Sequence, residues 1–470
     1  MGRCGLRGKK RGVRITFRRA ALLTVLACGV CAGASATASA ASPTINHVFV
    51  IGLENESYNS TFGPLPGSQY LAKTLAPDGA LLQHYYGIGH ESLDNYIAMI
   101  SGQPPNVDTQ ADCQFFNNVF PGTIGADGIV TGQGCIYPAA TQTVVNQLDS
   151  DGLSWRAYAQ DMANSVSAGQ AASCRHPTVN GQDSTQSAKA NDQFAGRHVP
   201  FIYFHSIIDT TDCASDVVDL KQLPGDLKQE GSTPNYSFIT PDLCADGHDA
   251  SCPDGSPGGF AGIDRFLREW VPRITGSPAY QDRGLLLITF DEAADSDASA
   301  CCNEQPGPNT PNPGGTTFGP GGGRVGAVAL SPCIAPGTVS DHAYNHYSQL
   351  RWLEDNFGLT YLGYAGQQDL KSFGSDVFTR PGCEEQPQLK VRPRHPHAGK
   401  RTVFRFRVDS PLDRCKQGVL IRFAGKHRKT DANGKARIAK RFSHRGVRVA
   451  KARTPGCDLA RKRVRIKRAR

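Results

Sequence analysis

LLQHYYGIGHESLDNYIAMISG, residues 81–102, is the stretch on which the interpretation of the whole chain depends. Its first six residues are apolar and aromatic enough to predict a strand, which Gly87 and Gly89 end. Apolar residues then recur at helical spacing from Leu93 to Ile100. The pattern predicts a strand, a tight turn and a helix, with Ser92 at the turn.

A serine at the start of a helix can have two roles. Unpaired N–H groups and the helix dipole favour negative charge there, so Ser92 is a candidate nucleophile for a transferring phosphoryl group. Serine is also a common helix cap, and this segment in isolation favours the cap. The rest of the chain has to decide between the two roles.

Residues 1–40 have the pattern of an export signal, in which basic residues precede an apolar run at 20–33 and small residues at 36–40. We therefore expect a secreted, extracellular protein. The pair Arg18-Arg19 leaves twin-arginine export open, and Cys28 leaves lipidation open. After the signal, no segment is long and apolar enough to span a membrane.

Cysteine usage agrees with export. Twelve of the fifteen cysteines follow the signal, an even number that suits disulfides in an oxidising compartment, and no spacing is typical of a zinc site. Proximity in the sequence predicts the pairs Cys113–Cys135, Cys174–Cys213, Cys244–Cys252 and Cys415–Cys457. Four cysteines have no assigned partner: Cys301, Cys302, Cys333 and Cys383.

The charge divides the chain into two parts. Residues 41–383 contain 15 Lys and Arg against 36 Asp and Glu, whereas residues 384–470 contain 28 against 6. We therefore predict an acidic domain at 41–383 and a basic C-terminal domain at 384–470.

The basic region is predicted to be a small β-domain. Residues 402–408 and 418–423 alternate apolar with polar residues, and 431–435 suit a turn between strands, whereas the run 461–470 has no evident apolar face to bury. Its charge allows docking on the acidic body or retention at an anionic cell-envelope polymer or phospholipid surface, and we favour retention. Export makes nucleic acid an unexpected partner.

Apolar runs typical of buried strands occur at 45–53, 285–290 and 325–330, an alternating strand is expected at 236–240, and another strand begins at Trp155. Helices are expected at 144–153, 259–274 and 348–357. The region from residue 103 to 138 is rich in Gly, Pro and Asn and is expected to form a disulfide-tied loop over the active face. These elements predict an α/β fold, a doubly wound sheet with helices on both faces.

Polar residues that suit a metal or an anion follow several of these strands. In a doubly wound sheet such positions converge on one edge. The candidates are Glu54-Asn55, Asp242, Asp246, His248, Asp291-Glu292 and His346. Adjacent carboxylates repel each other unless a cation neutralises them, so a divalent metal explains Asp291-Glu292 economically. A solvated loop at Glu54, a polar turn closed by Cys244 and Cys252 and a merely packed His198 are the alternatives.

The motifs resemble the bacterial phosphoesterase family of the alkaline-phosphatase-like superfamily, which contains acid phosphatases and phospholipases C, and they are closest to its secreted acid phosphatases. The family's Glu-Asn-x-Ser motif is similar to residues 54–57, and its His-x-Ser-x-Pro-Asn-Tyr motif to residues 90–96. Its Asp-x-His-Asp, Asp-Glu and Asn-His-Tyr motifs resemble residues 246–249, 291–292 and 345–347. One departure is Asp94, which stands where the family usually has proline and adds a charge near Ser92.

The resemblance implies a phosphoserine mechanism on an alkaline-phosphatase-like fold. Ser92 would be the nucleophile, with Asn95 donating to a phosphoryl oxygen and His90 or His198 as charge partner or leaving-group acid. Glu54, Asn55, Asp291 and Glu292 would hold one divalent metal, of zinc, iron, manganese, magnesium or calcium, beside the serine. Asp242 or Asp246, with His248 and His346, would hold a second.

We therefore expect a metal-dependent hydrolase whose substrate is a phosphomonoester. Two alternatives remain open. One is a phospholipase C-type phosphodiesterase, although no exposed apolar segment suggests docking on lipid. The other is an inactive envelope-binding protein, against which the intact candidate residues argue.

Overall fold

The computed structural model describes Pro43 and residues 45–163, 172–315, 319–380, 388–410, 416–454 and 457–468. The predicted export signal at 1–40 lies outside these residues, as do Cys383 and Cys415. The predicted Cys415–Cys457 pair is therefore not described.

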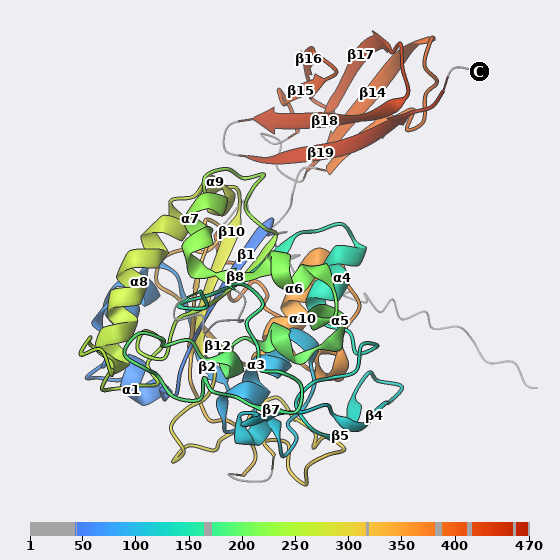
Figure 1. The fold of residues 1–470 in the computed structure, drawn as a ribbon. Coiled ribbons are helices and arrows are strands. Elements are labelled where there is room, and N and C mark those ends of the chain that lie inside the picture. Colours follow the sequence, from blue (N-terminus) through green and yellow to red (C-terminus); the bar gives the residue numbers. More distant parts are fainter. Residues whose placement is uncertain are drawn as a thin grey trace, which may run out of the picture. The chain divides into compact units, whose positions relative to one another are not determined.

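An eight-stranded mixed sheet forms the centre of the larger part of the chain (Figure 1). Its central strand β1 is buried at every residue and pairs in parallel with β10 and β9, as the continuous apolar run predicts. In spatial order the strands are β12 (Thr338–Asn345), β2 (Ala80–Tyr86), β11 (Ala327–Leu330), β10 (Gly284–Phe290), β1 (His47–Leu53), β9 (Tyr236–Thr240), β6 (Trp155–Ala159) and β8 (Val217–Asp219).

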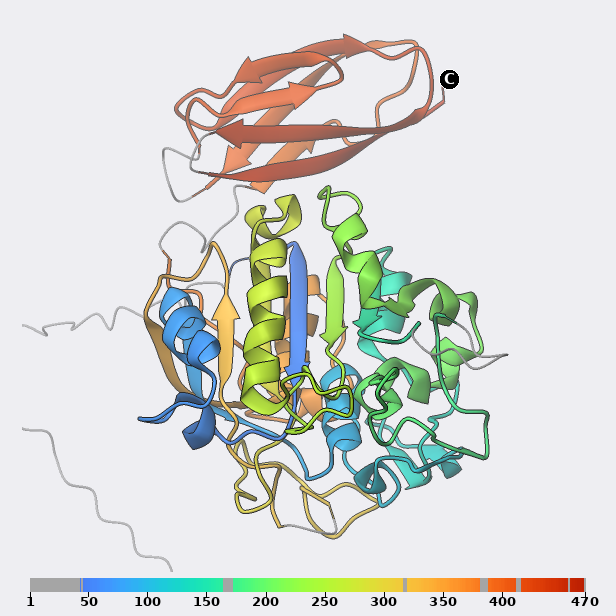
Figure 2. The same cartoon turned by 60° about the vertical axis from the view of Figure 1, so that its left-hand side comes forward.

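Helices cover both faces of this sheet. Helix α8 lies on one face, and α3 and α10 lie on the other (Figures 1 and 2). The helices are α1 (Tyr58–Phe62), α2 (Ala76–Asp78), α3 (Ser92–Ser101), α4 (Val144–Ser150), α5 (His205–Ile208), α6 (Thr211–Asp216), α7 (Leu223–Asp226), α8 (Gly259–Thr275), α9 (Pro278–Gln281) and α10 (His346–Phe357). The predicted α/β fold with helices on both faces is confirmed.

Helix α8 shows why these segments become covering helices. Its buried residues include Ile263, Phe266, Leu267 and Trp270, which recur at helical spacing, while Arg268 and other charged residues face solvent. The apolar stripe is buried against the sheet.

Two strands differ from the expectation. Strand β11 is antiparallel to both of its neighbours, β10 and β2, so the sheet is mixed. Strand β9 is buried at all five residues, although its sequence alternates. Its small polar side chains explain the difference, because Ser237 and Thr240 can be buried between strands at lower cost than charged residues.

Disulfides tie the loops. Three predicted pairs are present: Cys113–Cys135, Cys174–Cys213 and Cys244–Cys252. The neighbours Cys301 and Cys302 form a fourth disulfide, and Cys333 is also disulfide-bonded. The predicted loop at 103–138 contains the short strands β3 (Phe115–Phe116), β4 (Phe120–Ile124) and β5 (Val130–Gln133), and β3 pairs with β7 (Gly181–Gln182).

The C-terminal region is β-structure, as predicted. Its two antiparallel sheets enclose a hydrophobic cluster of their own, in which Phe404 and Phe423 lie with ring centroids 4.8 Å apart. The sheets have the orders β13-β14-β17 and β16-β15-β18-β19. The strands are β13 (Gln388–Arg392), β14 (Arg401–Asp409), β15 (Leu420–Phe423), β16 (Lys426–Lys429), β17 (Lys435–Arg441), β18 (Gly446–Thr454) and β19 (Cys457–Ile466).

One expectation about this region is wrong. The run 461–470 was expected to have no apolar face, but Val464 and Ile466 of β19 are buried in the cluster. Two apolar residues at alternate positions are enough for a strand whose other face is cationic. The division of the chain into domains at residue 384 remains a prediction.

Within the described part of the chain, no helix combines the length and the apolar character that crossing a bilayer requires.

Candidate active site

Ser92 is the first residue of α3, and its side chain does not cap the helix. The residue at the cap position is Glu91, whose φ is +85°. The Ser92 hydroxyl is almost fully buried and donates a hydrogen bond of 2.7 Å to Glu54 Oε2. Because the hydroxyl is directed at a carboxylate, the structure favours a chemical role for Ser92 over a capping role.

Glu54 follows the last residue of β1 and is completely buried. Its Oε1 accepts a 2.6 Å hydrogen bond from the Tyr96 hydroxyl, one helical turn after Ser92. Gly52 permits this approach, because a Cβ at residue 52 would lie 2.8 Å from the Tyr96 ring. Burial first, and then the neighbouring carboxylates of Asp291 and Asp246, raise the pKa of Glu54 well above its usual value.

His198 lies between two buried carboxylates. Its Nε2 is 3.4 Å from Glu54 Oε2, and its Nδ1 is 3.1 Å from Asp246 Oδ2. Burial lowers the pKa of His198 well below its usual value, so the ring is neutral at ordinary pH. Glu54, His198 and Asp246 offer ligand atoms that lie within 4.8 Å of one another. The sequence placed His198 among the catalytic groups, whereas the structure places it among the candidate ligands.

Asp242 does not join this cluster. Its Oδ1 accepts the N–H groups of Cys244 and Ala245 and thereby forms the turn after β9. Of the two aspartates considered for one ligand position, Asp246 is the one that reaches Glu54 and His198. Burial raises the pKa of Asp242 to about 7.

Asn55 and Asp291 present oxygens that the protein leaves unpaired. The Asn55 N–H donates to Asp291 Oδ1 at 3.0 Å, and Asn55 has a φ of +60°, a conformation that is uncommon outside glycine. Asn55 Oδ1 and Asp291 Oδ2 are buried without a hydrogen-bond partner among the described residues. Burial raises the pKa of Asp291 to about 7, although hydrogen bonds from the backbone N–H groups of Asn55 and Glu292 act in the opposite direction.

These donors fit a divalent cation. Buried carboxylates are normally paired with a cation, and unpaired buried oxygens are costly. Besides burial, the charges of Asp291 and Asp246 raise the pKa of Glu54, and the charge of Asp291 also raises the pKa of Asp246. The unpaired oxygens of Asn55 and Asp291 belong to the same group of residues. Carboxylates, an amide oxygen and one imidazole suit several divalent metals, so the donor set does not select one.

Glu292 is held beside this cluster by His90. His90 Nδ1 lies 2.6 Å from Glu292 Oε2, and at this distance one proton lies between the two atoms. The other ring nitrogen, Nε2, donates to the Asp297 carbonyl at 3.2 Å. The Glu91 N–H also donates to Glu292 Oε2. His90 therefore fixes the position of Glu292.

Asn95 is occupied by the turn that precedes the helix. Its Oδ1 accepts the N–H groups of Ile88 and Gly89, and its Nδ2 donates to the carbonyls of Gly89 and Glu91. The expected donation to a phosphoryl oxygen would break one of these bonds. The geometry instead makes Asn95 the brace that shapes the turn before Ser92.

His346 and His248 lie outside the group of candidate ligands. His346 Nε2 donates to the Asp291 carbonyl at 2.6 Å, and Nδ1 is 3.2 Å from the Tyr85 hydroxyl. Burial lowers the pKa of His346 to about 4, so the ring is neutral and positions the Asp291 backbone. His248 Nε2 accepts from Arg197 at 3.0 Å, which occupies its lone pair. Among the described residues both rings thus have other partners, and a second metal site that includes these two histidines stays a prediction.

Arg197 and Asp112 are part of the site, and the sequence analysis missed both. Arg197 is buried, and its Nε lies 3.1 Å from Asp112 Oδ2. Asp112 Oδ1 in turn accepts the N–H of Leu93 in the first turn of α3. The pairing joins α3 to the segment before His198. The adjacency of Arg197 to His198 was the available signal, but Asp112 lies in an irregular loop that has no periodic pattern.

Asp94 carries less charge than the sequence suggested. Its carboxyl group is buried, and burial, followed by the charges of Asp112 and Glu91, raises the pKa of Asp94 well above its usual value. The neutral form therefore persists to higher pH than for an ordinary aspartate. At acidic pH Asp94 adds no negative charge near Ser92.

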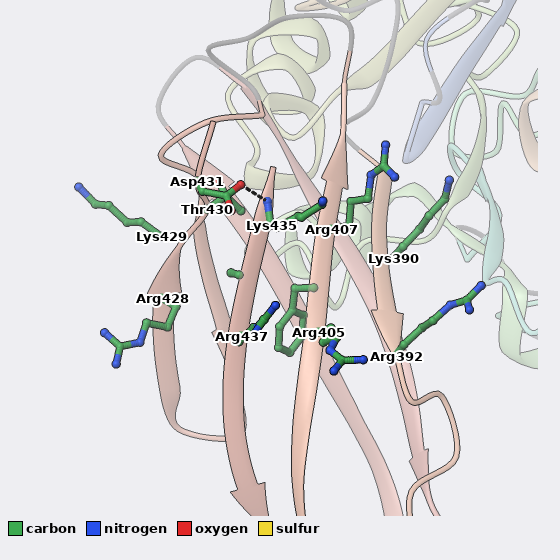
Figure 3. A pocket seen from close by; sticks show the side chains of 12 residues that line it. Lys390, Arg392, Arg405, Arg407, Arg428, Lys429, Thr430, Asp431, Lys435 and Arg437 are labelled. Atoms are coloured by element: carbon green, nitrogen blue, oxygen red, sulfur yellow. Dashed lines mark hydrogen bonds between the residues drawn. The ribbon is translucent and has the colours of Figure 1, made fainter. Parts of the chain in front are cut away.

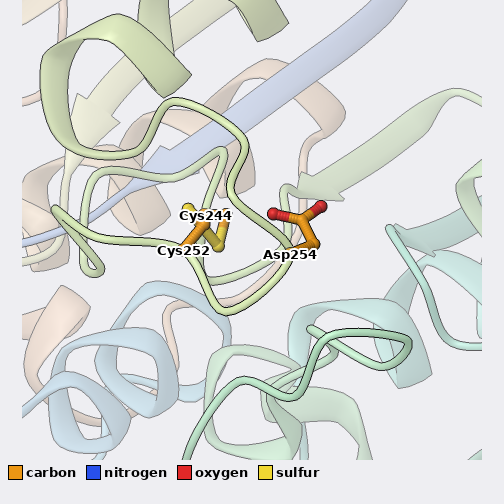
Figure 4. Close-up of side chains that lie close together, drawn as sticks. All are labelled: Cys244, Cys252 and Asp254. Carbon is orange, nitrogen blue, oxygen red and sulfur yellow. A yellow bond between two sulfur atoms is a disulfide. The ribbon is translucent and has the colours of Figure 1, made fainter.

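Cys244, Cys252 and Asp254 also lie together, but they do not form a metal site. Figure 4 shows the two sulfurs joined in a disulfide, with Asp254 beside them. A disulfide sulfur lacks the thiolate charge that a metal requires. The Cys244–Cys252 disulfide therefore closes a loop and does not bind a metal.

The sequence profile of the Phosphoesterase family matches residues 68–360. A probable acid phosphatase of Kluyveromyces lactis is 25% identical over 318 residues, which cover 67% of this chain and 59% of that protein. An acid phosphatase of Aspergillus fumigatus is 23% identical over 322 residues, covering 68% and 56%. A phosphatidylinositol-3-phosphatase of Mycobacterium tuberculosis is 24% identical over 367 residues, covering 77% and 95%.

The chain thus spans 56–59% of the length of these two fungal relatives. The family profile, in contrast, covers more than half of this chain and includes the helix that begins at Ser92. The matched segment also contains His198, Asp246, Asp291 and His346. On this match, the chain belongs to the phosphoesterase family.

Proposed function

We propose that this protein is a secreted, metal-dependent phosphomonoesterase that acts through a phosphoserine intermediate. The observation that carries the proposal is the hydrogen bond from the Ser92 hydroxyl to Glu54 Oε2, inside a group of buried carboxylates with unpaired oxygens. A serine oriented towards a base, with ligand atoms for a cation beside it, is the arrangement that phosphoryl transfer to serine requires.

In the first step, Ser92 Oγ attacks phosphorus and its proton passes to Glu54, 2.7 Å away. The bond from phosphorus to the leaving oxygen breaks with its electron pair on oxygen, and the released alkoxide takes up a proton from water to become the alcohol. In the second step, water attacks the phosphoserine, inorganic phosphate leaves and Ser92 regains its proton. The start of α3 favours the negative charge of the phosphoryl group throughout.

Glu54, Asn55, Asp291 and Asp246, with His198, would hold one divalent metal. When bound, it would stabilise negative charge on the serine oxygen and on the phosphoryl group. The surrounding residues position these groups: Tyr96 holds Glu54, His346 holds the Asp291 backbone and His90 holds Glu292.

Phosphomonoesters are the proposed substrate class because the named relatives are acid phosphatases and a phosphatidylinositol-3-phosphatase. Secretion is supported by the four disulfides that join described cysteines, since disulfides persist mainly in oxidising compartments. The active-site geometry also argues against an inactive binding protein.

The test compares hydrolysis of a phosphomonoester chromogen and a phosphodiester chromogen by the same sample, whose metal content is measured by elemental analysis. We expect monoester hydrolysis that Ser92→Ala abolishes, and a stoichiometric divalent metal. Preferential cleavage of the diester would reassign the substrate class. Wild-type turnover by a protein that contains no metal would remove the proposed mechanism.

A further inference from the structure

Two rows of cations cross the exposed face of the β13-β14-β17 sheet (Figure 3). Each row contains one residue from each strand, and neighbours in a row are directly opposite in the strand register. The rows are Lys390–Arg407–Lys435 and Arg392–Arg405–Arg437. Adjacent strands are about 4.8 Å apart, and alternate residues along a strand are about 6.6 Å apart. The six cations therefore form a regular array.

This array opposes the stability of the sheet that carries it. Like charges directly opposite each other on neighbouring strands are destabilising. Asp409 reduces the charge repulsion in the first row, because its carboxylate forms ion pairs with Lys390 Nζ at 2.8 Å and with Arg407 Nε at 2.5 Å. Among the described residues, no carboxylate forms an ion pair with Arg392, Arg405 or Arg437. A bound anion would supply the negative charge that this second row of arginines lacks.

The array forms the floor of a groove with a volume of about 940 Å³. Arg428 and Lys429 of β16 also line the groove, so cations from two sheets contribute to it (Figure 3). The lining comprises Lys390, Arg392, Arg405, Phe406, Arg407, Arg428, Lys429, Thr430, Asp431, Lys435, Ala436 and Arg437. Eight of these twelve residues are cationic and one is acidic.

The character of the lining distinguishes between classes of anion. Phe406 and Ala436 are its apolar members, and both are buried. Within the described lining there is thus no exposed aromatic ring on which a nucleobase could stack and no exposed apolar side chain that could enter a bilayer. A groove, unlike a flat cationic face, accommodates a chain. These features favour a flexible linear polyanion.

We propose that this groove binds a linear phosphodiester polymer of small polyol units. Five of the eight cations are arginines, whose planar fork matches phosphate oxygens in a bidentate geometry. Successive phosphates of one chain would contact successive rows. The proposal concerns a second site and stands or falls independently of the proposed catalytic function.

The test uses the full-length protein and two triple variants of equal net charge. The groove variant is Arg392→Gln/Arg405→Gln/Arg437→Gln. The control variant is Lys451→Gln/Arg463→Gln/Arg465→Gln, which removes three exposed cations from β18 and β19 and none from the groove. Binding to synthetic poly(glycerol phosphate) is measured at several salt concentrations.

We expect the groove variant to bind about tenfold more weakly at low salt. The slope of log K against the logarithm of the salt concentration should be shallower by about 2, because each lost phosphate contact removes about 0.7 from this slope. The control variant should bind as the wild type does. Equal weakening of both variants would show that net charge, and not the groove, is responsible.

Two further probes separate the alternatives. Vesicles that contain phosphatidylglycerol and a short DNA duplex are offered to the wild type and the groove variant under the same conditions. We expect weaker binding to both than to poly(glycerol phosphate). Tighter binding to either probe would overturn the assignment. Thermal unfolding of each variant confirms that it is folded, and poly(glycerol phosphate) should raise the melting temperature of the wild type more than that of the groove variant.

Discussion

The hydroxyl of Ser92 donates to the carboxylate of Glu54 across 38 positions of sequence, at 2.7 Å. The contact exists because β1 ends at the edge of the sheet where α3 begins. Neither residue is exposed. The proposed nucleophile and its proposed base therefore meet inside the protein, which strengthens their interaction.

Ser92→Ala should abolish turnover and leave the protein folded. The substitution removes the attacking atom and one hydrogen bond to Glu54, which costs about 1 kcal/mol of stability. Turnover and the unfolding midpoint are measured together. The control is Ser101→Ala at the other end of α3, where the hydroxyl donates to the Ile97 carbonyl. Retained turnover in Ser92→Ala would mean that another residue is the nucleophile.

Tyr96→Phe should weaken metal binding or turnover roughly 10- to 100-fold, the usual effect of losing a group that orients a metal ligand. The Tyr96 hydroxyl donates to Glu54 Oε1, and phenylalanine keeps the ring but not this bond. Metal titration and kcat are the measurements. Tyr236→Phe is the matched control, because the buried Tyr236 hydroxyl has no hydrogen-bond partner among the described residues. Identical effects of both substitutions would argue against the role of Tyr96.

Chelation should inactivate the enzyme, and Asp291→Asn should lower the amount of bound metal. The Asp291 carboxylate offers an unpaired buried oxygen to the cation, and asparagine removes its charge. Elemental analysis after dialysis gives the readout. Asp254→Asn is the control, since Asp254 is exposed beside the Cys244–Cys252 disulfide (Figure 4). Full activity after exhaustive chelation would contradict the metal site.

Glu354 should make the protein less stable as pH rises. Burial raises the pKa of Glu354 to about 9 from a usual value of 4.5, although the Leu362 N–H donates to its Oε1 at 2.9 Å. Between these values the folded state holds a proton that the unfolded state has released, so its contribution is complete below pH 4.5 and is lost as pH rises through about 9.

Glu354→Gln resembles the protonated side chain and lacks this titration. Relative to the wild type, its free energy of unfolding should rise between about pH 5 and about pH 8, by at most about 1.4 kcal/mol per pH unit. Urea unfolding at both pH values measures the difference. A constant difference between variant and wild type would show that Glu354 is ionised in the folded protein.

The sequence predicted the sheet well because the central strands are buried on both faces and therefore read as continuous apolar runs. Polar residues after β1 and β10 were correctly expected at a common edge, since parallel strands end together. The direction of β11 could not be predicted, because a short apolar run of four or five residues has the same pattern in either direction.

Within the site, the contacts of individual residues could not be predicted from the sequence. Helical spacing identified Tyr96 as a core position, but its hydroxyl contact with Glu54 depends on the approach that Gly52 permits. The pairing of Arg197 with Asp112 joins two loops that share no pattern. Asp242 and Asp246 were equivalent in composition, and only the turn geometry separated them.

The antiparallel pairing of β11 with β10 has a consequence for the turn that precedes Ser92. Because β10 and β11 run in opposite directions, the chain leaves the sheet after Phe290 and returns at Ala327 on the same edge, with no crossover helix among the described residues between them. The intervening segment supplies Asp291 and Glu292, and through the Asp297 carbonyl it also holds His90. Near its end, Gly322 and Gly323 exchange backbone hydrogen bonds with Gly87, so a change in the path of this segment would reach the turn before Ser92 while the strand register stays unchanged.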